Sequence, residues 1–342
     1  MNNHLSTSAA GAPQPLSVDS ANEIAARLRR RLRAAVKGRD AVIDLLLIAL
    51  FADGHVLLED FPGSGKTTLA RALGESLAPD PSDTLPSFRR IQFTPDLLPS
   101  DITGTNVFDP ETRRFDFRRG PIFAHVVLAD EINRTSPKVQ AAMLEAMAEK
   151  QVTIDDVSHP LDDLFFVIAT QNPLDLAGTY PLPTPQLDRF LFKVRMEPIE
   201  RAAELEVLAT YPNAPLALSA QEPQVSRAEI LGARRAIRGG VAIAAPIKEA
   251  LVDMARRTRE DPRVAQGAST RSLVLLLPAL QARAVLAGRD YVAPDDLAAL
   301  AEPVLRHRMS YMPGVEDPER VVADALAPTL DQLAKAGLRR GS

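Results

Sequence analysis

The chain has 342 residues, of which 46% are hydrophobic and 25% are charged, and its formal net charge at pH 7 is −4. This length and composition are typical of a soluble globular protein with about two domains, and the negative charge gives no electrostatic footprint for nucleic acid over the chain as a whole. The lack of cysteine excludes disulfides and thiolate metal sites and agrees with a reducing, cytoplasmic compartment.

The first 18 residues predict a disordered tail, because they are rich in Ser, Ala, Asn and Pro. They have neither a cationic start nor an apolar core, which argues against a signal peptide. The longest apolar run, residues 41–52, includes Asp44 and is too short to span a bilayer. We expect a buried helix there and no membrane insertion.

From about Ser20 to Arg195, short apolar strands alternate with amphipathic helices. This alternation is typical of an α/β domain whose parallel sheet is covered by helices on both faces. The candidate strands are residues 56–59, 90–93, 126–129, 165–169 and 191–194. We place the α/β core at residues 19–197.

After about residue 198, strand signals vanish and helix signals dominate. Ser226 and Glu229 have the spacing of a capping box, which predicts the start of a helix. The run from about Thr270 to Ala287 predicts a longer one. We therefore expect residues 198–342 to form a helical linker and an all-α domain.

Residues 59–68, Glu-Asp-Phe-Pro-Gly-Ser-Gly-Lys-Thr-Thr, lie between an apolar strand and a helical pattern, the context that a phosphate-binding P-loop requires. Gly63 and Gly65 allow the backbone to curl so that several N–H groups converge on phosphate oxygens. The helix that begins near Lys66 points the positive end of its dipole at the same anion. Lys66 would reach the β- and γ-phosphates, and the Thr67 hydroxyl would ligate Mg²⁺.

One position departs from the strict P-loop pattern, because Asp60 stands where glycine is expected. The alternative interpretation of the segment is a glycine-rich turn with a surface lysine. The phosphate cradle does not depend on Asp60, so we favour the P-loop. The expected nucleotide-binding residues are Pro62, Gly63, Ser64, Gly65, Lys66, Thr67, Thr68 and Asp130.

Asp130 and Glu131 end an apolar strand that begins near His125. In open α/β sheets, ligands bind at the carboxyl ends of the strands. Asp130 would hold Mg²⁺, directly or through water, and Glu131 would orient and polarise the water that attacks the γ-phosphorus. A solvated strand end with an acidic turn is the alternative, but the P-loop earlier in the chain favours the catalytic interpretation.

Three further side chains fit a nucleoside triphosphatase. Asn172 follows the apolar strand 164–170, and its amide could bond both water and γ-phosphate, although this segment taken by itself favours a plain turn. Arg189 precedes the last strand, and Arg271 opens a helix of the all-α half. Either arginine could be an ordinary surface residue, whereas an arginine finger is worth about 10³–10⁵ in rate.

Taken together, these segments resemble the MoxR family of AAA+ ATPases, from about Ala35 to Tyr311. The segments that carry the resemblance are residues 37–40, 57–67, 90–101, 130–134, 170–173, 187–190, the segment around Arg271, and residues 304–308. The resemblance implies a P-loop AAA+ core, with a five-stranded parallel sheet in an αβα arrangement, followed by an all-α lid domain. It also implies a ring, usually a hexamer, with ATP at the subunit boundaries.

The resemblance further implies individual roles. Asn172 is similar to sensor 1, Arg189 to an arginine finger acting in trans, and Arg271 to sensor 2 on the lid; Arg134 is a second candidate for the trans-acting arginine. Thr184 stands where the family often has an acid, which bears on the orientation of Arg189. The expected catalytic residues are Glu131, Lys66, Asn172, Arg189 and Arg271, and the expected metal ligands are Thr67 and Asp130.

Two inserted segments also match the family. Residues 106–120 resemble its helix-2 insert, and residues 151–162 resemble the hairpin before sensor 1. In the family such inserts typically face the pore or a client.

The leading functional hypothesis is Mg²⁺-dependent ATP hydrolysis that drives chaperone-like remodelling, assembly or activation of a protein client. Relatives often work with partners that carry von Willebrand factor A domains. The first alternative is a nucleic-acid motor, against which the overall acidity argues, and no nucleic acid is expected as a partner. The second is a nucleotide-gated scaffold with negligible turnover, against which Asp130 and Glu131 argue.

Overall fold

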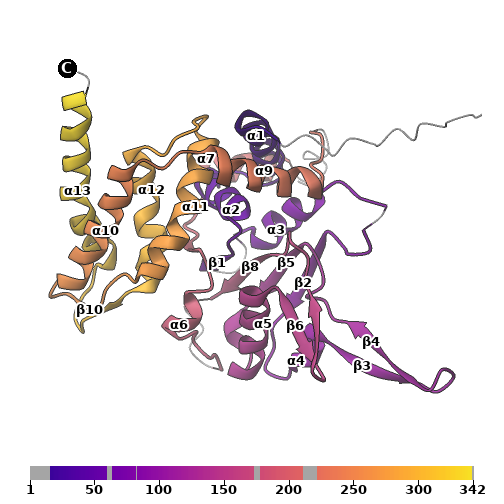
Figure 1. Cartoon of the computed structure of the whole chain (residues 1–342). Coiled ribbons are helices and arrows are strands. Elements are labelled where there is room, and N and C mark those ends of the chain that lie inside the picture. Colours follow the sequence, from indigo (N-terminus) through magenta and orange to yellow (C-terminus); the bar gives the residue numbers. More distant parts are fainter. Residues whose placement is uncertain (1–15, 60–63, 82, 173–177, 211–221, 341–342) are drawn as a thin grey trace, which may run out of the picture.

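The computed structural model describes residues 16–59, 64–81, 83–172, 178–210 and 222–340 (Figure 1). Most of the predicted tail lies outside the described residues, but its last three residues belong to the fold. Ser17 Oγ accepts a hydrogen bond from the N–H of Ser20 and so caps helix α1 (Val18–Ala35). Leu16 packs against the hydrophobic core. The prediction of disorder as far as residue 18 was therefore wrong at its end, because the helix cap and the apolar contact fix this segment.

A five-stranded parallel sheet forms the centre of the α/β part, in the order β2-β5-β8-β1-β9. The strands are β1 (Val56–Glu59), β2 (Phe88–Gln92), β5 (Val126–Asp130), β8 (Phe166–Gln171) and β9 (Phe192–Arg195). All five predicted strands are confirmed, with ends shifted by at most two residues. Strands β1, β5 and β8 are almost wholly buried, as expected for strands with helices on both faces.

The two faces of the sheet contribute to two separate hydrophobic cores. Along β5, Val126 and Leu128 pack with α1, α2 (Asp40–Ala52) and α3 (Lys66–Glu75), whereas Val127 and Ala129 pack with α5 (Pro137–Glu149). Successive side chains of a strand point to opposite faces, so the apolar run of β5 feeds both cores. The short helices α4 (Pro99–Thr103), η1 (Ile132–Arg134) and α6 (Thr184–Leu187) complete this part of the chain.

The C-terminal half is mainly helical, as predicted. Its helices are α7 (Arg201–Ala209), α9 (Arg227–Gly240), α10 (Ala245–Glu260), α11 (Thr270–Leu286), α12 (Pro294–Leu305), η2 (Arg306–Arg308) and α13 (Pro318–Arg340). The predicted capping box of Ser226 and Glu229 is confirmed at the start of α9. The expectation that strands end near residue 198 was wrong, because β10 (Val264–Gln266) and β11 (Ser310–Tyr311) pair antiparallel. Three and two residues are too short for an alternating pattern to emerge.

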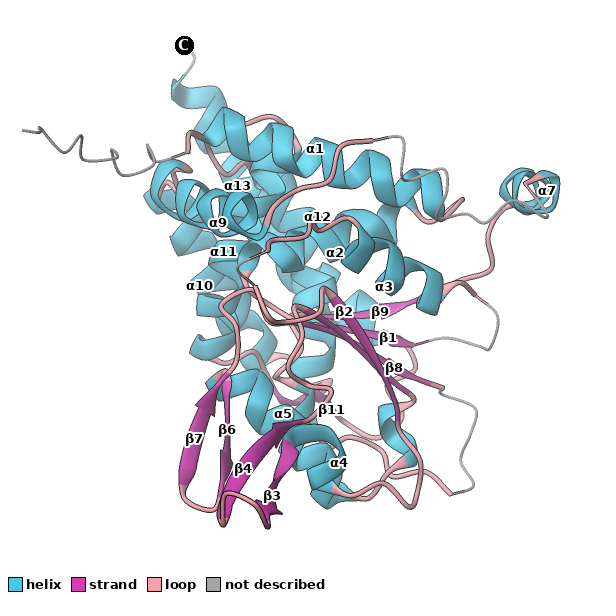
Figure 2. Ribbon diagram, turned by 90° about the vertical axis from the view of Figure 1, so that its right-hand side faces the viewer, coloured by secondary structure: helices cyan, strands magenta, loops and turns pink. Residues whose placement is uncertain are grey.

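Two β-hairpins project beside each other from the α/β part (Figure 2). The first consists of β3 (Gly104–Asp109) and β4 (Arg114–Arg119), and the second of β6 (Gln151–Ile154) and β7 (Val157–Pro160). The ring of Phe117 stacks on His159 with 3.8 Å between centroids. Asn106 Nδ2 donates a hydrogen bond of 2.6 Å to Asp155 Oδ2. Both predicted inserts are therefore hairpins, and these contacts join them.

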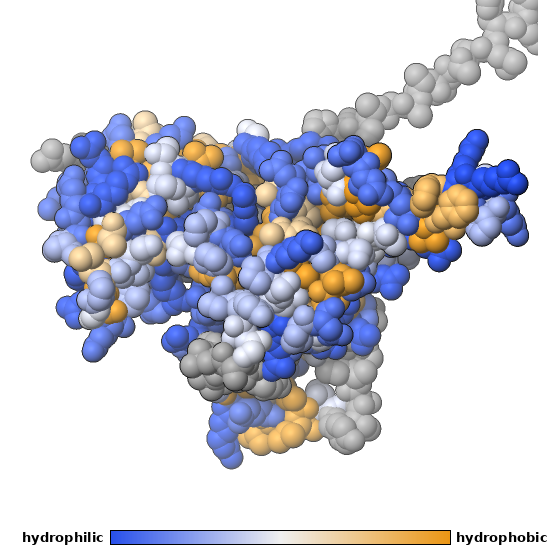
Figure 3. Space-filling view, turned by 90° about the horizontal axis from the view of Figure 1, so that it is seen from below, coloured by the Kyte–Doolittle hydropathy of each residue, from blue (hydrophilic) through white to orange (hydrophobic). Residues whose placement is uncertain are grey.

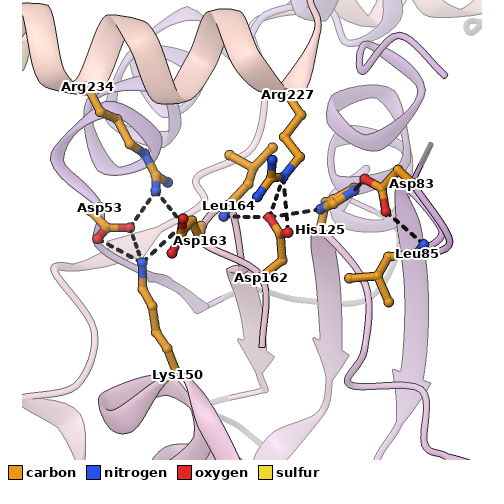
Figure 4. Close-up of polar contacts among 10 residues, drawn as sticks. All are labelled: Asp53, Asp83, Leu85, His125, Lys150, Asp162, Asp163, Leu164, Arg227 and Arg234. Atoms are coloured by element: carbon orange, nitrogen blue, oxygen red, sulfur yellow. Dashed lines mark hydrogen bonds and ion pairs between the residues drawn. The ribbon is translucent and has the colours of Figure 1, made fainter. Parts of the chain in front are cut away.

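Two arginines of helix α9 hold it beside the amino ends of the sheet's strands (Figure 4). Arg227 Nε lies 2.8 Å from Asp162 Oδ1, and Arg234 Nη1 lies 2.6 Å from Asp53 Oδ1. Asp53 also binds Lys150 Nζ at 2.8 Å. The amino ends of the strands are opposite to their carboxyl ends, so α9 leaves the carboxyl ends accessible. Among the described residues, no helix is both long and apolar enough to cross a membrane.

Candidate nucleotide-binding site

A hollow of about 440 Å³ opens at the carboxyl ends of β2, β5 and β8, beside the first turn of α3. It is lined by Ser64, Gly65, Lys66, Thr67, Thr68, Arg90, Gln92, Asp130, Glu131, Thr170, Gln171 and Asn172. The structure thus brings the described part of the predicted P-loop together with the paired acids and the predicted amide. Pro62 and Gly63 lie outside the described residues.

The start of α3 supplies the anion-binding side of the hollow. The helix begins at Lys66, directly after Gly65, whose φ of +93° lies in the left-handed region. A β-carbon on Gly65 would meet no heavy atom within 4 Å, so the backbone conformation, not crowding, is what requires glycine. The first N–H groups of a helix have no acceptor within it, and its dipole is positive there. This end of α3 is therefore suited to phosphate.

Thr170, on β8, holds both acids at the end of β5. Its Oγ1 donates a hydrogen bond of 2.7 Å to Asp130 Oδ1 and accepts one of 2.8 Å from the N–H of Glu131. Asp130 is buried, with 7% of its surface exposed. Glu131 has a φ of +59°, a strained value for a residue with a side chain and one that is concentrated at functional sites.

Two residues of β2, Arg90 and Gln92, complete the acidic side, and neither was predicted from the sequence to be a site residue. Arg90 binds Asp130 Oδ2 through Nη2 at 2.6 Å and Nε at 3.0 Å. Gln92 Nε2 donates a hydrogen bond of 2.6 Å to Glu131 Oε2. Polar residues at alternate positions near a strand's carboxyl end point to the same side, and this was the signal that could have revealed them.

The donor set fits a magnesium nucleotide. Thr67 offers a hydroxyl and Asp130 a carboxylate, and Mg²⁺ prefers such oxygen ligands. In the described part of the chain, no group of three or more His, Cys, Asp or Glu residues could hold a metal by itself. Magnesium at ATPase sites commonly uses one or two protein ligands together with substrate phosphates and water. Thr67 and Asp130 match that number of protein ligands.

Comparison with known proteins decides the family. The model of the ATPase family associated with various cellular activities (AAA) matches residues 55–192, and the model of the AAA lid domain matches residues 256–327. Chaperone MoxR1 of Mycobacterium tuberculosis is 37% identical over 299 residues, which cover 81% of this chain and 73% of that protein. The chain belongs to the MoxR family of AAA+ ATPases.

Other relatives agree with this assignment. Protein MoxR of Methylorubrum extorquens is 32% identical and covers 86% of this chain and 90% of its own. The uncharacterised protein YeaC of Bacillus subtilis is 45% identical over 91% of this chain and 93% of its own. The crystal structure of a candidate ATPase from Cytophaga hutchinsonii superposes with a TM-score of 0.80 at 35% identity and covers 90% of this chain and 96% of that one. This MoxR-family protein is therefore an ATPase with an α/β AAA+ core and a helical C-terminal part.

The three predicted arginines lie at different places. Arg134 Nε is 3.5 Å from Glu131 Oε2 of the same chain. Arg189 follows α6, where its N–H donates to the carbonyl of Gln186. Arg271 lies in the first turn of α11 with Nε 3.3 Å from Asp188 Oδ2. Among the described residues, neither Arg189 nor Arg271 lines the hollow of its own chain.

Proposed function

We propose that this MoxR-family ATPase binds Mg·ATP in the hollow. The observation that supports this proposal is that Lys66, Asp130 and Glu131 line the same hollow. Lys66 and the amides at the start of α3 would bind the phosphates. Thr67 and Asp130 would ligate Mg²⁺, which when bound neutralises charge on the β- and γ-phosphates. The remaining nucleotide contacts are assigned to Pro62, Gly63, Ser64, Gly65 and Thr68.

Glu131 would orient and polarise the attacking water, and Asn172 would hold that water or the γ-phosphate in place as sensor 1. The bonds from Thr170 support this assignment, because they fix the Asp130 carboxylate and the Glu131 backbone relative to each other. Preorganised groups of this kind lower the barrier without reorganising during the reaction.

We further propose that Arg189 acts in the hollow of a neighbouring subunit, within a ring that the family resemblance implies to be a hexamer. Arg189 is not among the residues that line the hollow of its own chain, which supports a role in trans. Arg271, at the start of α11, is assigned as sensor 2 and would leave Asp188 to reach nucleotide.

A mixing experiment tests the ring. Arg189→Ala and Glu131→Gln proteins should each bind ATP without hydrolysing it. In a mixed ring, a Glu131→Gln subunit presents an intact Arg189 to an intact Glu131 next door, so part of the activity should return. Arg134→Ala, mixed in the same way, compares the two candidate arginines. No recovery at any ratio with Arg189→Ala would contradict its role in trans.

We propose that hydrolysis drives chaperone-like remodelling or activation of a protein client, with the β3–β4 hairpin in contact with it. Phe108 and Phe115 on this hairpin are 50% and 69% exposed, with ring centroids 5.3 Å apart. The hairpin is the arm that projects to the right in Figure 3, where an apolar patch lies among hydrophilic residues. Exposed apolar patches mark interaction sites. A relative in Mycobacterium tuberculosis is named a chaperone, and the resemblance suggests a von Willebrand factor A domain protein as client in the cytoplasm.

Capture of the client by Glu131→Gln protein in the presence of ATP tests this assignment. The same protein with Phe108→Ser and Phe115→Ser added should lose the captured protein while it keeps ATP binding. Equal capture by both proteins would contradict the role of the hairpin.

The nucleic-acid motor is the remaining rival, since Arg113, Arg114, Arg118 and Arg119 lie on or next to β4. Phosphate contacts give a steep loss of affinity as the salt concentration rises. Binding to DNA or RNA, measured at several salt concentrations, therefore distinguishes a nucleic-acid motor from an ATPase that acts on a protein client. We expect no salt-sensitive binding. Steady-state phosphate release separates the ATPase from a scaffold.

A further inference from the structure

The guanidinium of Arg90 lies between two polar partners at the end of β2. Its Nη2 is 2.6 Å from Asp130 Oδ2 and 2.7 Å from Gln92 Oε1, and its Nε is 3.0 Å from the same Asp130 oxygen. The strand register explains the contact, because Gln92 pairs with Asp130 and Arg90 with Leu128 on adjacent strands. Hydrogen bonds to Gln92 and Asp130 therefore fix the Arg90 guanidinium beside the Asp130 carboxylate.

Both oxygens of Asp130 already have partners. Oδ1 accepts a hydrogen bond from Thr170, which is 1% exposed, and Oδ2 faces the Arg90 cation. The Asp130 side chain is 10% exposed, whereas that of Arg90 is 48% exposed. The Thr170 contact is thus buried and fixed, while water can solvate the Arg90 guanidinium if it withdraws. Oδ2 is the oxygen that can change partner.

We propose that Arg90 competes with Mg²⁺ for Asp130 Oδ2 and so sets the magnesium concentration at which the site accepts Mg·ATP. This inference rests on the proposed role of Asp130 as a metal ligand. A divalent ion at Oδ2 and a guanidinium at 2.6 Å from the same oxygen repel each other. Arg90 must therefore move away when the ion arrives, and the work of moving it raises the magnesium requirement. Arg90 is a positioning residue in this scheme, not a ligand of the nucleotide.

The experiment measures binding and not turnover. A fluorescent ATP analogue is titrated with full-length protein at a series of Mg²⁺ concentrations, starting from excess EDTA, and the Mg²⁺ concentration giving half the gain in affinity is recorded. Arg90→Gln removes the charge but keeps a polar side chain, and Arg90→Ala removes both. We expect the half-maximal Mg²⁺ concentration to fall about two- to fivefold in each variant, the range for loss of one exposed ion pair.

Arg89→Ala is the matched control. Arg89 is an exposed arginine on the same strand and pairs with Val127, so its side chain points to the opposite face. The variant changes the net charge by the same amount, and its half-maximal Mg²⁺ concentration should equal that of the unmodified protein. In an Asp130→Asn background, which lacks the carboxylate that the two cations would share, Arg90→Ala should no longer change the half-maximal Mg²⁺ concentration.

The outcomes separate the inference from the proposed function. A half-maximal Mg²⁺ concentration that stays the same or rises in both Arg90 variants overturns the competition, as it would if Arg90 only supported the pairing of β2 with β5. Failure of the unmodified protein to bind the analogue at any Mg²⁺ concentration would instead contradict the nucleotide site itself.

Discussion

The carboxylate of Asp188 accepts a hydrogen bond of 2.8 Å from Nε of Arg308, whose side chain is 1% exposed. Burial lowers the pKa of Arg308 to about 10, and the charge of Asp188 opposes that shift. The same carboxylate lies 3.3 Å from Nε of Arg271, whose side chain is 62% exposed. Asp188, next to Arg189, thus joins the end of α6 to η2 and α11 of the helical half.

Removal of the Asp188 carboxylate should destabilise the protein far more than removal of Arg271. Asp188→Ala leaves a buried cation without its counter-ion, so we expect a loss of about 3 kcal/mol in the free energy of unfolding. Arg271→Ala removes an exposed pair and should cost less than about 1 kcal/mol. Urea unfolding measures both values. Equal effects of the two substitutions would show that the Arg308 contact does not carry this stability.

Thr170→Val should slow ATP hydrolysis while ATP affinity stays nearly constant. The substitution removes the bonds to the Asp130 carboxylate and to the Glu131 N–H at once. Loss of a hydrogen bond to a charged group costs about 1.5–3 kcal/mol, which corresponds to about a 10- to 100-fold lower kcat. Thr170→Ser, which keeps the hydroxyl, is the control. An unchanged kcat in the Thr170→Val protein would show that these hydrogen bonds do not contribute to catalysis.

Gly65→Ala should weaken nucleotide binding, because alanine resists the φ of +93° that this position adopts. Gly314 is a matched control, since its φ is +90° and its missing β-carbon also meets no heavy atom within 4 Å. We expect each substitution to lower stability by about 1–2 kcal/mol. Only Gly65→Ala should raise the Kd for ATP, measured by calorimetry. An unchanged Kd would argue that the start of α3 does not grip phosphate.

His125 connects the amino ends of two strands to α9 (Figure 4). Its Nε2 contacts Asp83, and its Nδ1 lies 3.4 Å from Asp162, which also binds Arg227. Burial acts to lower the pKa of His125, but the hydrogen bonds and charges of Asp162 and Asp83 outweigh it, so the pKa is raised. A histidine whose pKa is raised on folding stabilises the fold fully below its unfolded pKa of about 6.5, and this contribution is lost as pH rises through the folded value.

His125→Gln should therefore lose more stability at pH 6 than at pH 8.5. Urea unfolding of both proteins at the two pH values gives the difference. Burial lowers the pKa of His55 to about 4, which costs stability as pH falls below about 6.5. The unmodified protein and the His125→Gln protein both bear this cost, so it cancels in the difference between their free energies of unfolding. A stability difference that is independent of pH would contradict a charged His125 in the folded protein.

Much of the fold could be predicted because its signals are local. Strand β5 is recognisable from its unbroken apolar run, and α9 from the capping box of Ser226 and Glu229. The pairing of Lys66 with Asp130 and Glu131 in one hollow was predictable too, because P-loops and acidic strand ends both lie at the carboxyl edge of a parallel sheet.

The contacts of Arg90 and Gln92 could not be predicted in the same way. They depend on β2 lying next to β5, and strand order is a property of the whole sheet. The contact of Arg271 with Asp188 likewise joins residues more than 80 positions apart in the sequence. Side-chain patterns within one element do not carry such information.

ATP binding and phosphate release by Lys66→Ala and Glu131→Gln proteins, measured side by side, test the central claim most directly. We predict that Glu131→Gln binds ATP with the affinity of the unmodified protein and releases no phosphate, whereas Lys66→Ala binds no ATP. Full ATP affinity in the Lys66→Ala protein, or sustained turnover in the Glu131→Gln protein, would contradict the account.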